Sequence, residues 1–218
     1  SDLIGFALVL SVGLIHGAND LLIIKKNSKF TSNYSQFWPF FTYVGLVFIG
    51  FTFFYLFPSF ALIAFIIVSV YHFGEQHLEA IPITRSLKNN YRFISIVSHG
   101  IILFTIIFMN NINTVNNVFL SFKINFLNSN TLNIILITAS IVYISTLVIN
   151  KYLTSFIFSE ILFFVLFYFL SLTSTLILCF SVYFIFFHSI LSIKDQVKYI
   201  YGNNDSSSLK RYLLDRKS

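Results

Sequence analysis

Long apolar runs are the feature that most constrains this chain. Runs such as FALIAFIIVSV (60–70) and ILFFVLFYFL (161–170) contain no charged residue and do not alternate polar with apolar positions. About 20 largely apolar residues form one helical crossing of a bilayer, whereas membrane β-strands alternate. Only 10% of the 218 residues are charged, against about a quarter in soluble domains. The sequence therefore predicts an all-α, polytopic transmembrane helix bundle.

The apolar runs are numerous enough for about seven spans. The segment 110–131 mixes Asn with apolar residues and is expected to be an interfacial connection, and the polar stretch 171–175 should separate the last two spans. Residues 1–202 form the predicted transmembrane domain and 203–218 a polar tail. The first span lacks a basic leader and carries Asp20, so we expect it to stay in the mature protein. The predicted spans are 3–24, 37–57, 59–77, 91–109, 132–150, 152–170 and 175–194.

The basic residues indicate an orientation. With seven spans, every Lys and Arg except Lys123 falls on one side of the membrane. The positive-inside rule then predicts an N-terminus outside, a cytoplasmic C-terminus and a multi-pass location in the cell (inner) membrane. Because these residues sit in loops and a tail, they do not predict a nucleic-acid partner. The single Cys179 excludes an internal disulfide.

Few ionisable residues lie in the predicted spans, and their depths agree. Counting 1.5 Å per residue from the cytoplasmic ends puts the imidazoles of four spans roughly 7 to 12 Å below one surface. The carboxyl group of Glu160 reaches the same layer, while Glu75 and His77 lie close to the boundary. Burying such groups in hydrocarbon is costly, so they mark a functional site. The four histidines are His16, His72, His99 and His188.

Histidines from several helices in one layer favour a metal site in the bundle core. A donor set rich in imidazole and without thiolate suits iron, copper or zinc better than magnesium or calcium. Asp20 follows His16 by four residues and could orient that imidazole; alternatively, it reaches interfacial water or Lys25. Any one histidine could instead be a packed, hydrogen-bonded residue, and Glu160 a protonated carboxyl bonded inside the bundle.

Several motifs together resemble one known family. The sequence contains HGANDLL (16–22), YHFGEQH (71–77), SHG (98–100), SEILFF (159–164) and YFIFFHSILS (183–192). Their order and spacing resemble those of the bacterial and archaeal membrane β-carotene 15,15′-dioxygenases, over roughly residues 12–202. The resemblance implies an integral helical enzyme that uses O2 and histidine-bound Fe(2+) to split β-carotene at its central double bond. It further implies that the two retinal products are passed to a rhodopsin.

The resemblance implies ligand roles residue by residue. His16, His72 and His188 match the family's metal-binding motifs, and Asp20 closes the first of them. The family usually has a second histidine where this chain has Ser192, and an Asp where this chain has His77, so His77 could supply the missing imidazole. We therefore predict His16, His72, His77 and His188 as ligands. His99 is the competing fourth ligand, and Asp20 and Glu160 are further candidates for a ligand or supporting role.

The family usually continues with further hydrophobic segments, so this chain is expected to be a truncated or short variant. Other functions compete with the oxygenase: a non-enzymatic haem or metal-binding protein, or a proton- or ion-conducting protein that uses the same intramembrane groups. A seven-helix retinal protein would need a Schiff-base lysine deep in its last helix, and the nearest here is Lys194 at the membrane edge.

Overall fold

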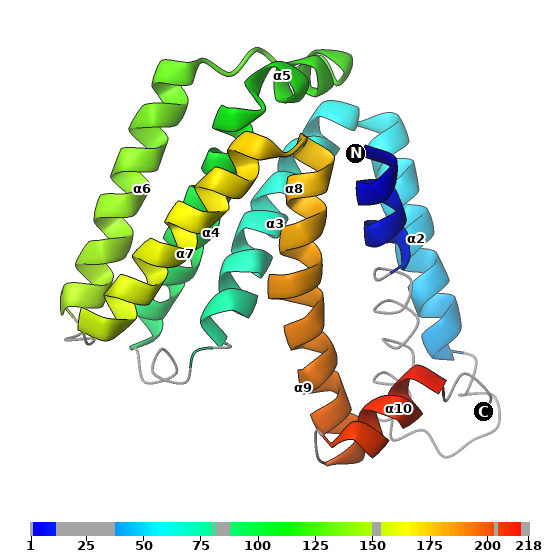
Figure 1. Cartoon of the computed structure of the whole chain (residues 1–218). Coiled ribbons are helices and arrows are strands. Elements are labelled where there is room, and N and C mark those ends of the chain that lie inside the picture. The colour runs from blue at the N-terminus through cyan, green and yellow to red at the C-terminus, as the bar shows by residue number, and fades with distance from the viewer. Residues whose placement is uncertain are drawn as a thin grey trace.

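The computed structural model describes residues 2–11, 38–79, 81, 88–149, 154–202 and 205–214. All regular secondary structure in this part of the chain is helical, as predicted (Figure 1). After a first helix, Asp2–Ser11, the elements are α2 (Trp38–Leu56), α3 (Pro58–Glu79), α4 (Asn89–Asn110), α5 (Ile112–Ser121), α6 (Ser129–Ile149), α7 (Thr154–Thr173), α8 (Leu176–Tyr183), the π-helical turn η3 (Phe184–Ser189), α9 (Ile190–Tyr201) and α10 (Ser206–Leu214).

Five helices of the described residues are long and apolar enough to cross a membrane. They are α3, α4, α6, α7 and the continuous run Leu176–Tyr201, and each overlaps one of the predicted spans. The first two predicted spans correspond to shorter apolar helices, Asp2–Ser11 and Val44–Leu56. Much of the first predicted span lies outside the described residues, so the count of seven spans stays a prediction.

The connections also follow the sequence pattern. The predicted separation at 171–175 is confirmed, since α7 ends at Thr173 and α8 begins at Leu176. Thr175 caps α8 because its hydroxyl accepts a hydrogen bond from the backbone N–H of Leu178. The ten-residue α5 lies across one end of the bundle (Figure 1). At that length it is a connection between α4 and α6 and not a membrane crossing.

Helix α4 is the centre of the bundle. It packs against α3, α6, α7 and α8, and eleven of its residues are buried. In contrast, α2 lies at the opposite edge of the molecule from α6 (Figure 1) and leaves side chains such as Phe48 and Phe51 about 70% exposed. The exposed apolar surface suits contact with lipid tails.

Two glycines allow α3 and α4 to approach closely. A Cβ atom at Gly74 would lie 2.1 Å from the carbonyl oxygen of Ile96, and one at Gly100 would lie 1.9 Å from that of Val70. Replacing either glycine by a residue with a Cβ atom would force the two backbones apart, since real Cβ atoms do not come that close. Small residues that bring backbones together are a common basis of helix association in membranes. Here they fix the spacing between His77 on α3 and His99 on α4.

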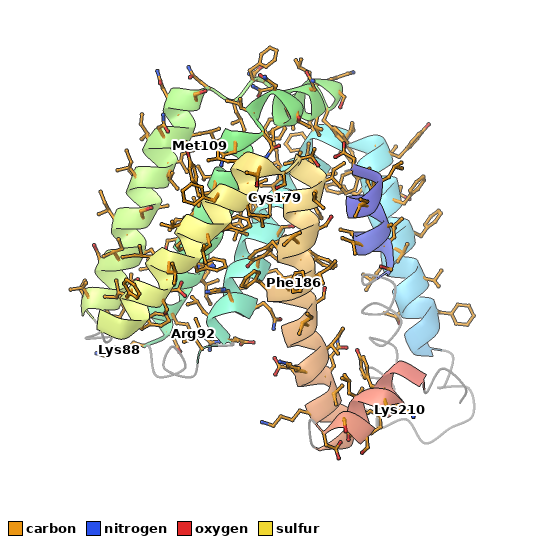
Figure 2. All side chains as sticks on the ribbon, viewed as in Figure 1. Lys88, Arg92, Met109, Cys179, Phe186 and Lys210 are labelled. Carbon is orange, nitrogen blue, oxygen red and sulfur yellow. The ribbon has the colours of Figure 1, made fainter. Side chains whose placement is uncertain are left out.

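Basic residues at the start of α4 and on α10 lie toward one end of the molecule. Figure 2 shows Lys88 and Arg92 at the start of α4 and Lys210 on α10, all toward the same end, with Met109 at the far end of α4. Arg92 Nη2 lies 2.8 Å from Glu79 Oε1, which joins α4 to the last residue of α3. This distribution agrees with the predicted asymmetry of charge, and the direction of the termini across the membrane stays a prediction.

Candidate metal centre

Three buried side chains converge from three helices. His77 comes from the last turns of α3, His99 from the middle of α4 and Glu160 from α7, and their side chains are 10%, 0% and 7% exposed. One candidate ligand atom from each residue lies within 4.8 Å of the others. Among the described residues, this is the one group of three or more His, Cys, Asp or Glu side chains close enough to bind one metal ion.

The carboxylate of Glu160 connects the two histidines. His77 Nε2 lies 3.0 Å from Glu160 Oε1, and His99 Nδ1 lies 3.5 Å from Glu160 Oε2. The two imidazole rings stack with their centroids 4.0 Å apart and an interplanar angle of 21°. This stacking depends on the close approach of α3 and α4 at Gly74 and Gly100.

A tyrosine and two phenylalanines complete the surroundings. Tyr143 on α6 donates a hydrogen bond of 2.7 Å from its hydroxyl to Glu160 Oε2, which fixes the orientation of the carboxylate. The Phe163 ring centroid lies 4.8 Å from that of His77, and the Phe164 centroid 4.9 Å from that of His99. These rings, from the same helix as Glu160, cover the histidines with apolar surface. We refer to His77, His99, Glu160 and Tyr143 as the α4 cluster.

The ring nitrogens of His99 are unusual for a buried residue. Within the described residues neither Nδ1 nor Nε2 makes a hydrogen bond of ordinary length, since the contact of Nδ1 with Glu160 Oε2 is 3.5 Å long, although the side chain is fully buried. Burying such a polar group without a partner costs roughly 1 to 3 kcal/mol, and native structures rarely retain it without a reason. A metal ion would satisfy a lone pair of this imidazole. The donor set of the α4 cluster, two imidazoles and one carboxylate, is the one found in non-haem Fe(II) oxygenases, which leave coordination positions open.

His72, a predicted ligand, lies on a different side of α3. It precedes His77 by five residues, which separates the two side chains by about 140° around the helix axis. Its side chain is exposed and lies outside the α4 cluster. Its ring contacts that of Phe73, with centroids 6.1 Å apart.

The other predicted site residues lie wholly or partly outside the described residues. His16 and Asp20 lie outside the described residues, as does the side chain of His188. The backbone of His188 belongs to η3, the π-helical turn FIFFHS. Single π-helical turns inside α-helices occur frequently at functional sites, which fits a role for this motif. The predicted set of His16, His72, His77 and His188 therefore stays a prediction.

Three members of the α4 cluster are candidates from the sequence alone, and the fourth is not. His77, His99 and Glu160 were all candidates, but Tyr143 was not. A signal was available: Tyr143 lies about as far from the end of its span as Glu160 does, so a depth count extended to phenol groups would have included it.

The fold and the cluster define a class of protein: a helical membrane protein with a buried group of imidazole and carboxylate donors that fits a metal ion. The sequence model of the family described as beta-carotene 15,15′-dioxygenase matches residues 7–217. The chain belongs to this family, as its motifs predicted. No curated protein and no solved structure gives a significant match.

Proposed function

We propose that the chain is an iron-dependent oxygenase that cleaves β-carotene at its central 15,15′ double bond. The match to the beta-carotene 15,15′-dioxygenase family over residues 7–217 carries this proposal. In the reaction the central C=C bond breaks and each of its carbons gains one atom of O2, so that one carotene gives two all-trans-retinal molecules. The membrane-spanning helices are consistent with a substrate that dissolves in lipid.

The donor set supports iron as the metal. Two imidazoles and a carboxylate bind Fe(II) and leave positions open, whereas Zn(II) has no redox chemistry. We propose His77, His99 and Glu160 as ligands, since these donors are already grouped and, within the described part of the chain, the ring nitrogens of His99 make no hydrogen bond of ordinary length. Bound iron would supply the activation of O2. The set His16, His72, His77 and His188 is the competing prediction, and the two sets share only His77.

The chain's own residues would prepare this site. The hydrogen bond from Tyr143 holds the Glu160 carboxylate in place, and orienting contacts of this kind are commonly worth 10- to 100-fold in metal affinity or activity. Phe163 and Phe164 exclude water from the histidines, which protects a reactive centre from side reactions. No proton donor or acceptor is required, because the net reaction adds two oxygen atoms and moves no proton.

Production of retinal in carotene-producing bacteria tests the proposal. Cells that express the chain should lose β-carotene and gain retinal in a ratio approaching two retinal molecules per carotene, and purified protein should contain iron. Cells that express the His99→Ala variant at the same level provide the control. Undiminished carotene without retinal would contradict the function, and longer and shorter cleavage products would contradict the central position.

We also propose the predicted setting of the enzyme: a multi-pass protein of the inner membrane, with an outside N-terminus and a cytoplasmic C-terminus, that passes retinal to a rhodopsin. The basic residues toward one end of the bundle support this orientation (Figure 2). Accessibility of single cysteines introduced at Lys88 and Lys123 to a membrane-impermeant thiol reagent in intact cells would test it. Labelling at position 123 alone is expected.

A further inference from the structure

A groove opens between α6 and α7, with α4 as its floor. The two helices are joined by a short connection but diverge from it toward the other end of the bundle (Figure 1), and both pack against α4. The groove has a volume of about 460 Å³, within the range of small-molecule sites, roughly 300 to 1,000 Å³. Its walls include Ile102, Ile106, Leu136, Ile144, Phe164 and Val165.

The groove reaches the α4 cluster. Glu160 and Tyr143, which interact with each other, both line it, while most of the remaining wall is aliphatic or aromatic. The side chains of Ile144 and Val165 are 42% and 44% exposed, so the groove opens sideways toward lipid along α6 and α7. A molecule entering from the membrane would therefore come to lie beside the Glu160 carboxylate.

The groove extends mainly to one side of Glu160. Along α7 its lining continues to Phe169, nine residues further on, which corresponds to about 13 Å of helix. On the other side it reaches only Ile157, about 5 Å away. This asymmetry suits a long, rod-shaped substrate whose reacting bond lies near Glu160. One half of such a molecule, its arm on one side of that bond, would lie along the groove.

We infer that the groove between α6 and α7 binds one arm of an uncharged linear polyene and is its entrance from the membrane. This inference rests on the proposed function. The occupant should carry no charge, because apart from Glu160, which the iron would engage, the described residues that line the groove are uncharged and almost all apolar, so a charged group there would lose its hydration without gaining a partner. The rings of Phe164, Tyr168 and Phe169 offer a stacking surface along the arm. A saturated lipid tail gains less from that surface and is the alternative that the experiment must exclude.

Two positions on α6 provide a matched pair of variants. Ile144 lines the groove, whereas Val142 lines a separate pocket of about 300 Å³ on another side of the helix, together with Phe93 and Ile94. Both side chains are β-branched and 42% exposed. Ile144→Trp should fill the groove, and Val142→Trp adds the same ring elsewhere on the same helix.

The experiment measures bound carotenoid and retinal formation separately, in wild type and both variants purified from carotene-producing cells and transferred to lipid nanodiscs. Ile144→Trp should retain at least tenfold less β-carotene than wild type and raise the KM for β-carotene with little change in kcat, while Val142→Trp stays within twofold. Iron content and the elution profile should match in all three proteins. Val165→Trp, on the facing helix, should reproduce the Ile144→Trp result, so that misfolding of one variant leaves the proposal testable.

The outcomes separate the two proposals. Equal carotenoid retention and equal KM in folded Ile144→Trp and Val142→Trp would overturn the proposal that the groove binds the polyene. Retention of phospholipid alone by the wild type would overturn it as well. Carotenoid that is lost only from the groove variants, in proteins that form no retinal, would uphold the groove and contradict the oxygenase.

Discussion

Helices α2 and α4 are both apolar, yet they lie in opposite environments. Each contains glycine: no described residue lies within 4 Å of a Cβ placed at Gly45 or Gly50 of α2, whereas Gly100 of α4 touches the backbone of α3. Beyond glycine, α4 carries Ser95, Ser98 and His99, all buried. Lipid tails are as apolar as leucine, so small and polar residues, and not hydropathy, decide which helix lies at the centre.

Replacing a glycine by leucine on each of the two helices should give the largest difference in stability between them. Gly100→Leu places its Cβ against the Val70 carbonyl and should destabilise the protein by about 3 kcal/mol or more, at the upper end of overpacking effects. Gly50→Leu, in open surroundings, should be neutral or stabilising by up to about 1 kcal/mol. Thermal unfolding in detergent measures both. Equal unfolding temperatures would show that the α3–α4 contact is not close-packed.

Glu160→Gln should remove iron while keeping the fold. The amide has nearly the shape of the carboxylate and still offers an oxygen to the Tyr143 hydroxyl, but it is a poorer ligand. The affinity for iron should fall by more than the roughly 100-fold that loss of an orienting contact costs. Titration with a competing chelator measures the change, and Ile161→Val, the exposed neighbour on α7, provides the control. Unchanged affinity would exclude Glu160 as a ligand.

Tyr143→Phe should give a smaller effect at the same site. It removes the 2.7 Å hydrogen bond to Glu160 Oε2, and we expect iron affinity to fall about 10- to 100-fold. Tyr183→Phe is the matched control, because its buried hydroxyl donates to the Phe73 carbonyl, at 3.4 Å, and not to Glu160. Similar chelator titrations for the two variants would argue against an orienting role for Tyr143.

The smallest effect is expected at the contact between α4 and α6. Ser95 Oγ and Thr146 Oγ1 lie 2.8 Å apart in the buried interface. A double-mutant cycle with Ser95→Ala and Thr146→Ala should give a coupling free energy of about 0.6 kcal/mol, the average for hydrogen bonds between membrane helices. Unfolding in mixed micelles measures it, and a coupling near zero would show that the two hydroxyls act independently.

Much of the fold could be predicted because hydropathy and helix breaks are local signals. The apolar runs located α3, α4, α6 and α7, and the polar stretch 171–175 located the end of α7. Depth counting put His99 and Glu160 in one layer, and the structure brings them together.

The rest of the site depends on how each helix is rotated about its axis and on which helices lie next to it. The depth of a residue along its helix carries no information on either. His72 and His77 belong to one motif, yet the turn of α3 separates their directions. The π-helical turn at His188 arises from backbone hydrogen bonding that no side-chain pattern marks. The central position of α4 depends on glycines whose role appears only when the partner backbone is placed.

Iron content of three purified proteins tests the central claim, that the iron is bound on the side of α3 that faces α4. Wild type should contain about one iron per chain. We expect His99→Ala to lose it and His72→Ala, folded to the same extent, to keep it, because His99 belongs to the α4 cluster and His72 does not. Iron that is retained by His99→Ala and lost from His72→Ala would contradict the claim and favour the set of His16, His72, His77 and His188.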